Sequence, residues 1–185
     1  MTKRRIYKII ALVVLVPVAI VVLFFAFIWG SMEWTKYSSK REAIIHQKEV
    51  CDTIKTIDAH FEFKFDSFSK KDLSEIHFYI IKNRLIDRDT VINFKPADDF
   101  ETQTISIQLD DLVISDELIV YVGKRYYILS DYQYVAYYNY GMFGPVGPCL
   151  CGGTGFQMLN GNPAGSGWLI KKFGLVNYKM PNRKV

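Results

Sequence analysis

Residues 60–66 are His-Phe-Glu-Phe-Lys-Phe-Asp, so every second residue is a phenylalanine and each residue between them is polar. Side chains alternate between the two faces of a β-strand, so this pattern places the three aromatic rings on one apolar face and the polar residues in water. Residues 104–110 (Thr-Ile-Ser-Ile-Gln-Leu-Asp) repeat the alternation with aliphatic residues. The two stretches predict strands of a sheet that buries one face.

Further strands are indicated by short segments rich in Ile, Val, Tyr and Phe, which are favoured on pleated surfaces. Gly123-Lys124 predicts a type II′ hairpin turn and Asn160-Gly161 a type I′ turn, because these residue pairs adopt positive φ at low cost. No helical pattern separates the strands, which favours antiparallel pairing. The predicted fold class is therefore all-β, an antiparallel β-sandwich (Ig-like or similar) over residues 58–185. The segments concerned are 75–82, 90–94, 117–122, 125–129 and 132–140.

The N-terminal part contains a membrane signal. Residues 9–29 are uncharged, and sixteen of these 21 residues are Leu, Ile, Val or Phe. As a helix they span about 32 Å, which matches a hydrocarbon core of about 30 Å. A cleaved signal peptide is the alternative, but its apolar region is shorter and ends in a small-x-small site, whereas here a bulky Ile28 precedes Gly30. The sequence predicts an uncleaved transmembrane helix.

Charge gives the expected orientation. Four basic residues lie within residues 1–8, and no acidic residue precedes Glu33. Positive residues stay on the cytoplasmic side, so we expect a cytoplasmic N-terminus, one membrane span and an exported C-terminal domain. The rest of the chain carries 19 basic and 19 acidic residues, which removes the electrostatic argument for a nucleic-acid partner.

The compartment follows less directly from the sequence. The chain has no Asn-x-Ser/Thr glycosylation motif. Together with the short basic N-terminus, this favours a bacterial inner membrane, with the C-terminal domain periplasmic or extracellular.

Residues 31–57 mix charged and apolar residues, and their isoleucines recur at helical spacing. Ser38 or Ser39 followed by Glu42 resembles a capping box. We expect a juxtamembrane helix over residues 39–56, which serves either as a spacer or dimerising helix or as a helix packed on the domain.

Three cysteines occur, Cys51, Cys149 and Cys151. Disulfides form in exported domains, and a bridge from Cys51 to either of the other two would close a loop of about 100 residues. The pairing stays open at this stage. Cys149-Leu150-Cys151 lacks the Cys-x-x-Cys spacing of a redox site.

No cofactor, metal site or catalytic set is predicted. The three histidines have no ligand-like spacing, and the Gly152–Gly155 run lacks the Lys-Ser/Thr that follows a phosphate-binding loop. Ser166 does not lie in a Gly-x-Ser-x-Gly elbow. Residues 141–167 hold nine of the twelve glycines, and we expect a long irregular segment that is either a contact loop or poorly ordered.

Tyrosine is concentrated in one place, with eight of the twelve between residues 121 and 140. If 132–140 is one strand, a stripe of aromatic side chains projects from one of its faces. Tyrosine gives a large contact area with a polar tip, so the stripe is a candidate binding face, and packing in the core is the alternative. The stripe comprises Tyr132, Tyr134, Tyr138 and Tyr140, with Phe143 just beyond.

These features favour a non-catalytic, membrane-anchored binding module whose partner is a protein, an envelope component or a glycan. An immunity-type or inhibitor-type accessory protein acting at the outer face of the membrane is one alternative. An envelope hydrolase that uses carboxylates such as Asp110 or Asp116 is another.

Overall fold

The computed structural model describes residues 3–95, 102–142, 144–163 and 167–184. The described chain is mostly β, with antiparallel sheets and one long N-terminal helix. It divides into two compact units. The first comprises Met1–Gln47 with Ala136–Leu150, and the second comprises Lys48–Val135 with Cys151–Val185.

Helix α1 (Lys3–Glu49) contains the apolar run together with the residues after it. Its apolar stretch has a mean hydropathy of 3.1 and none of it is buried within the chain, so the helix is long and apolar enough to cross a membrane. Pro17 lies inside the helix without ending it. The juxtamembrane helix expected over 39–56 is not a separate element: residues 39–49 are the last part of α1, which continues without a break to Glu49, and a short 3₁₀ turn η1 (Cys51–Thr53) follows.

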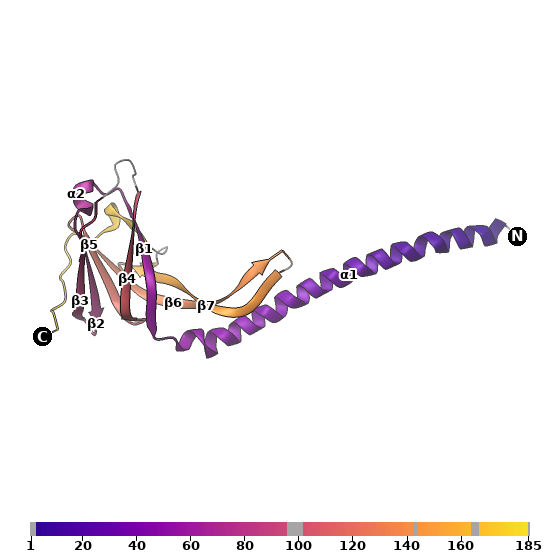
Figure 1. Cartoon of the computed structure of the whole chain (residues 1–185), viewed down its shortest axis with the longest axis horizontal. Helices are drawn as coiled ribbons and strands as arrows, with labels where there is room; N and C mark the ends of the chain where they lie inside the picture. The colour runs from indigo at the N-terminus through magenta and orange to yellow at the C-terminus, as the bar shows by residue number, and fades with distance from the viewer. Residues whose placement is uncertain (1–2, 96–101, 143, 164–166, 185) are drawn as a thin grey trace. The chain divides into compact units, whose positions relative to one another are not determined.

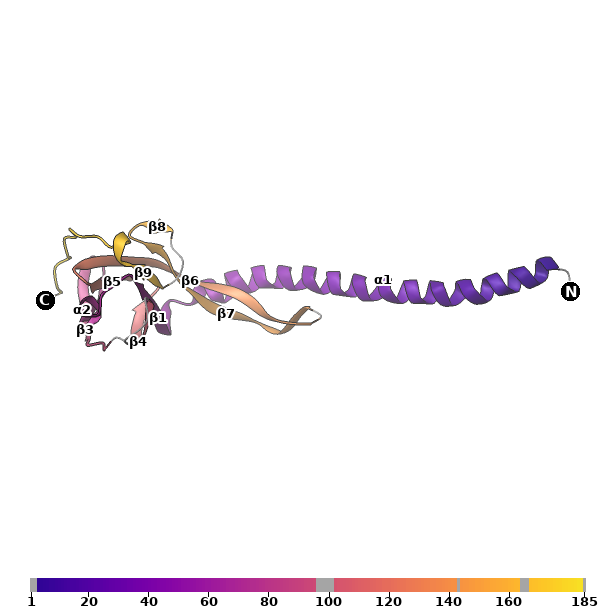
Figure 2. The ribbon, with the colours of Figure 1, turned by 90° about the horizontal axis from the view of Figure 1, so that it is seen from above.

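The first unit also contains the outer end of a long β-hairpin. Strands β6 (Arg125–Gly141) and β7 (Gly144–Leu159) are neighbours in one sheet, and Ala136–Leu150 is the part of this hairpin that belongs to the first unit. Figures 1 and 2 both show this end of the hairpin beside α1. The backbone N–H of Ala136 donates to Gln47 Oε1 at 2.7 Å, which fixes the two elements together.

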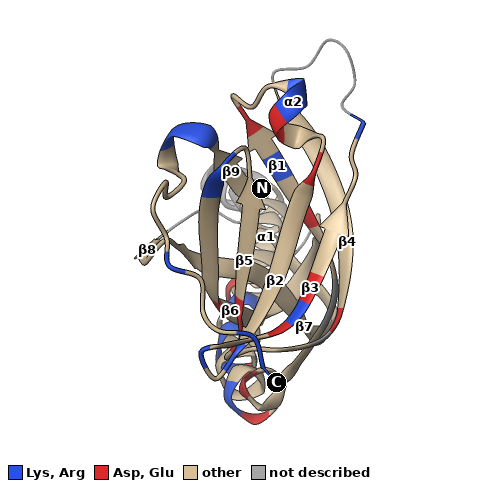
Figure 3. Ribbon diagram, turned by 90° about the vertical axis from the view of Figure 1, so that its left-hand side faces the viewer, with Lys and Arg blue, Asp and Glu red and all other residues tan. Residues whose placement is uncertain are grey.

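The second unit consists of two sheets. The strand order of the larger sheet is β3-β2-β5-β6-β7-β8, and that of the smaller is β4-β1-β9. All pairs with a described register are antiparallel except β1 with β9, which is parallel. Figure 3 shows β5, β2 and β3 side by side, with acidic and basic residues interspersed along the strands. The remaining bounds are β1 (Thr56–Asp66), α2 (Lys70–Leu73), β2 (Ile76–Lys82), β3 (Leu85–Ile92), β4 (Thr102–Val113), β5 (Glu117–Val122), β8 (Asn162–Pro163), β9 (Trp168–Ile170) and η2 (Lys171–Phe173).

The core of the second unit forms where the apolar faces of the two sheets meet. The strands predicted from strict alternation supply it: the phenylalanines of β1 and the alternating aliphatic residues Ile105, Ile107 and Leu109 of β4 are at most 7% exposed. Burial of such side chains contributes about 1.5–3 kcal/mol each. From the larger sheet the core receives Phe78, Ile80, Leu118, Val120, Val122, Tyr127, Leu129, Tyr132 and Phe156.

The Gly123-Lys124 turn differs from its prediction. Both residues have positive φ, 54° and 62°, whereas a type II′ turn needs positive φ only at the first. The turn therefore has the φ signs of type I′, which match the twist of the flanking strands β5 and β6. Asn160 and Gly161 also both have positive φ, as predicted for that pair.

Strand β6 contains two segments, 125–129 and 132–140, that are predicted from the sequence as separate strands. Between them lies Asp131 with φ 59°, a left-handed residue inside the strand. It changes which residues face the core, because Tyr127 and Leu129 are buried before it and Tyr132 after it. The sheet therefore keeps one buried face on both sides of the irregularity.

Most of the Gly-rich segment is strand rather than irregular chain. Strand β7 covers residues 144–159, and Pro145 and Pro148 lie in the part that belongs to the first unit. The prediction of an irregular segment over 141–167 is wrong for β7. A glycine in a strand can serve close packing, as Gly153 does against Tyr132.

Candidate functional site

The candidate site is an apolar hollow in the second unit, where the end of β7, β8, β9 and η2 meet. Its volume is about 580 Å³, within the range of roughly 300–1,000 Å³ of small-ligand sites. Its surface is mostly aliphatic and aromatic, with two asparagines among the lining residues. The hollow is lined by Leu159, Asn160, Asn162, Pro163, Trp168, Ile170 and Phe173.

Two aromatic side chains of the hollow are open to solvent. Trp168 is 46% exposed and Phe173 is 56% exposed. Each has a lysine above its ring: Lys64 Nζ lies 5.4 Å from the Trp168 ring centroid, and Lys172 Nζ lies 4.8 Å from that of Phe173. Cation–π attraction at exposed sites contributes about 0.5–1 kcal/mol. The hollow therefore combines an apolar surface with positive charge at its rim.

Asn160 holds the elements of the hollow together. Its backbone N–H donates to the Ile128 carbonyl at 2.8 Å, and its side-chain Oδ1 accepts the Ile128 N–H at 2.9 Å. The Asn160 amide Nδ2 then donates to the Phe173 carbonyl at 2.9 Å. One residue in a tight turn thus links β6 to η2, and its side-chain amide is engaged in this framework.

Tyr127 supports the same region from the core. Its hydroxyl donates to the carbonyls of Ile170 at 3.0 Å and Lys171 at 3.3 Å. Burial raises the pKa of Tyr127, so the phenol stays protonated and remains a donor. A β-carbon at Gly174 would lie 2.6 Å from Tyr127 Cζ, so a glycine is required where the chain passes this ring.

An ion pair anchors η2 on its other side. Lys171 Nζ lies 2.6 Å from Asp72 Oδ2, and the Ser69 hydroxyl and backbone N–H also donate to Asp72 in the capping box of α2. Partial burial raises the pKa of Asp72, but the hydrogen bonds from Lys171 and Ser69 outweigh it and lower the pKa to about 2. Asp72 is therefore ionised at neutral pH and fixes one of the lysines near the hollow.

No family model, curated protein or solved structure matches this chain.

The tyrosine stripe does not form one exposed face in the structure. Tyr132 is only 4% exposed, and its ring packs against Phe61 and Phe156 at centroid distances of 5.8 and 5.4 Å. Tyr134 is partly buried beside Tyr132, and its hydroxyl donates to the Thr56 carbonyl at 3.5 Å. The assignment of Tyr132 to a contact surface is corrected, because the shift at Asp131 turns it into the core.

The later part of the stripe belongs to the first unit. The Tyr138 ring is partly buried, and desolvation followed by the neighbouring Glu42 carboxylate and Cys149 thiol raises the pKa of its hydroxyl. Tyr140 is 77% exposed. Phe143 lies outside the described residues.

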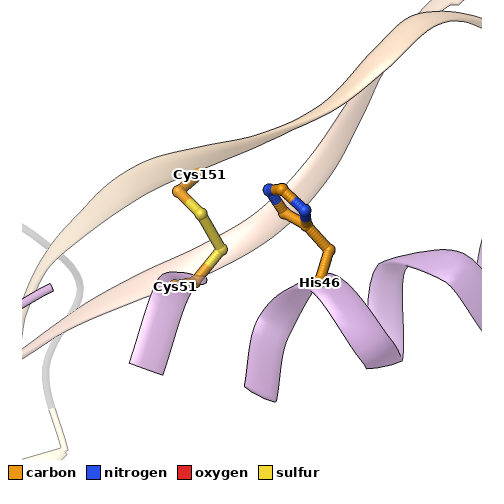
Figure 4. A group of neighbouring side chains, drawn as sticks. All are labelled: His46, Cys51 and Cys151. Atoms are coloured by element: carbon orange, nitrogen blue, oxygen red, sulfur yellow. A yellow bond between two sulfur atoms is a disulfide. The ribbon is translucent and has the colours of Figure 1, made fainter. Parts of the chain in front are cut away.

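The structure pairs Cys51 with Cys151, with a Cα–Cα distance of 5.5 Å (Figure 4). Cys149 is a free, buried thiol. The bridge joins η1 to β7 within the second unit. Because both sulfur atoms of the bridge are bonded to each other, neither supplies a thiolate to a metal ion.

Sequence reasoning missed Trp168 and Phe173 as site residues. Neither residue belongs to a recognisable motif, although lysines adjoin Phe173. An apolar run flanked by lysines does not distinguish a buried aromatic residue from an exposed one. Their exposure follows from the path of β8, β9 and η2, which depends on contacts with residues far away in sequence, such as Tyr127 and Ile128.

Proposed function

We propose that this chain is a single-pass membrane protein with its N-terminus in the cytoplasm and its β-rich part on the outer face of a bacterial inner membrane. The observation that carries the proposal is α1, whose apolar stretch has none of its residues buried within the chain. An apolar surface of this length in water is costly, and a bilayer removes that cost.

The orientation rests on charge. The four basic residues at Lys3–Lys8 precede the span, and the residues following it include both signs. A disulfide between Cys51 and Cys151 is consistent with an oxidising compartment, because reduced cytoplasm disfavours such bridges.

The exported part serves, in this proposal, as a non-catalytic binding module with a β-sandwich architecture. The two sheets around one core support a sandwich, and the Ig-like relation stays a prediction. The hollow beside Trp168 and Phe173 is its proposed contact site. It suits an envelope component or partner protein that presents an apolar or aromatic group next to a negative charge, because lysines stand over both exposed rings.

The membrane part of the proposal is tested by alkaline extraction of membranes that contain the full chain, followed by protease treatment of intact spheroplasts. We expect the chain to remain in the pellet and the β-rich part to be digested only from outside. Release at alkaline pH, or a mature protein that starts near residue 31, contradicts the anchor.

The binding part is tested by capture from native membranes with the full chain as bait. Trp168→Ala and Phe173→Ala remove the exposed rings, and we expect each to lose the captured component. Val91→Ala is a matched control, because it truncates an exposed apolar residue on β3, away from the residues that line the hollow. Equal capture by all variants contradicts the role of the hollow.

A further inference from the structure

The outer end of the β6–β7 hairpin (Ala136–Leu150) runs along α1 toward the N-terminus of the helix. Ala136 is bonded to Gln47, and Tyr138 lies beside Glu42. From Ala136 to Tyr138 the strand rises about 6.6 Å, and from Gln47 to Glu42 the helix rises about 7.5 Å. Because these two lengths are similar, the strand and the helix run side by side between the two contacts. Figures 1 and 2 show the same course.

The position of the hairpin tip follows from the same arithmetic. Met142 is four residues beyond Tyr138, or about 13 Å along the strand, which corresponds to eight or nine residues of helix before Glu42. The tip is therefore level with about Trp34. The apolar run ends at Trp29, so the tip lies about 7 Å beyond the end of the hydrocarbon-spanning segment. The polar headgroup layer on each side of a bilayer is about 5–7 Å thick, so the tip reaches the outer edge of this layer.

The chemistry of the tip fits this layer. Tyr140, Met142 and Val146 are 77%, 89% and 57% exposed, so the tip presents an aromatic ring and two apolar side chains to its surroundings. No charged residue occurs between Asp131 and Lys171. An uncharged tip with an aromatic ring and flexible apolar side chains is suited to the interface between water and acyl chains.

We propose that the tip of this hairpin inserts into the headgroup layer of the outer leaflet and forms a second membrane contact next to the transmembrane helix. The occupant of the exposed tip is therefore the lipid bilayer, and the argument for it is continuity: the same compact unit contains the span and the hairpin. This inference rests on the proposed function, because it requires that α1 crosses the membrane.

Such a contact constrains the tilt of α1. The tilt of a membrane helix is set by interfacial groups and by neighbouring elements. The hairpin is bonded to α1 through Gln47, so its insertion sets which face of a tilted helix points toward the lipid headgroups.

The test uses the full chain reconstituted in vesicles of phosphatidylethanolamine and phosphatidylglycerol. A cysteine labelled with an environment-sensitive fluorophore is placed at the tip (Met142→Cys), at an exposed position nearer the hairpin base (Tyr137→Cys) and inside the span (Val22→Cys). Tyr137 is 44% exposed and lies about 17 Å from Met142 along the strand, toward the hairpin base. Wild-type chain taken through the same labelling measures the contribution of Cys149.

Lipids with a spin-label quencher near the headgroup or deep in the acyl chain then report depth. We expect the label at residue 142 to be quenched by the headgroup-level lipid about twofold more strongly than the label at residue 137, and the label at residue 22 to be quenched most by the deep lipid.

The outcomes separate the two proposals. If residue 22 is quenched by the deep lipid but residue 142 is quenched no more than residue 137, the hairpin inference is overturned and the anchor stands. If residue 22 is not quenched, the anchor fails and the hairpin inference fails with it. A blue-shifted label at residue 142 without lipid quenching also overturns the inference, because protein, such as a second copy of the chain, then covers the tip.

Discussion

A β-carbon added to Gly153 would lie 2.0 Å from the hydroxyl oxygen of Tyr132 and 2.9 Å from its Cζ. The buried tyrosine ring thus fills the space that a side chain on β7 would occupy. Tyr132 in turn packs on Phe61 and Phe156, which come from two different sheets. One glycine in the Gly-rich segment is therefore required by the aromatic core.

Gly153→Ala is expected to destabilise the fold by about 1–3 kcal/mol, the usual cost of overpacking a well-packed core. Tyr132→Phe removes the atom in closest approach, so the double variant should recover part of the loss. Chemical denaturation followed by circular dichroism measures both. Gly161→Ala is unsuitable as a control because of its φ of 77°, whereas Gly30 has open space and serves instead. Equal stability of Gly153→Ala and wild type would contradict the packing argument.

The strands with strict alternation were predictable from the sequence because each supplies three or more side chains to one buried face. Residues 60–66 and 104–110 fall within β1 and β4, and these two strands pair with each other. The course of β6 was not predictable in the same way, because Asp131 adopts a left-handed conformation inside the strand. Whether the Tyr132 ring faces the core or solvent depends on the conformation of Asp131.

The bridge between Cys51 and Cys151 has a sequence separation of 100 residues. In the chain-entropy model its removal costs about 4–5 kcal/mol. Cys51→Ser and Cys151→Ser should therefore each lower the free energy of unfolding by this amount. The two variants should unfold at similar denaturant concentrations, both below that of the wild type. Cys149→Ala leaves the bridge intact and is the matched control. Thiol titration of the unfolded, unreduced wild-type chain should find one free thiol. Two or more free thiols would contradict the pairing.

Asp72 links stability to pH. Its pKa is lowered to about 2 from 3.8, so its ionised form stabilises the fold above pH 4 and this contribution disappears as the pH falls toward 2. With Lys171 36% exposed, solvent screening reduces the contribution to about 1–2 kcal/mol.

Asp72→Asn should therefore lower stability at pH 6 and show a shallower loss of stability between pH 4 and pH 2 than wild type. Thermal unfolding over this range measures it. Lys171→Gln removes the partner and should weaken the same pH dependence. A pH profile of Asp72→Asn parallel to that of wild type would show that the ion pair does not contribute.

Tyr127→Phe removes the hydroxyl that donates to Ile170 and Lys171. The two carbonyls lose a donor, so we expect a loss of about 1–3 kcal/mol and faster amide exchange in residues 170–173. Tyr126→Phe removes the hydroxyl of the neighbouring residue and leaves this pair of hydrogen bonds in place. If the amide exchange rates of η2 were the same in Tyr127→Phe and in wild type, contacts other than the Tyr127 hydroxyl would hold η2 in place.

The hollow itself could be predicted only in part. The Asn160-Gly161 turn was evident because both residues tolerate positive φ, and it forms one wall. The opposite wall depends on Asn160 reaching Phe173 and on Tyr127 reaching Ile170, contacts between residues 13 and 43 positions apart. Periodicity describes neighbours along a strand and contains no information about such pairs.

The sulfur–sulfur bond of Cys51 also sets a condition on biogenesis. Cys51 emerges from the ribosome long before Cys151, and the covalent ring between them closes only after the first half of β7 has been synthesised. Throughout that interval Cys51 carries an unprotected thiol close to the end of α1. Synthesis in a reducing cytosol leaves the ring open, so recombinant material of native connectivity requires an oxidising host compartment or a thiol oxidant during refolding.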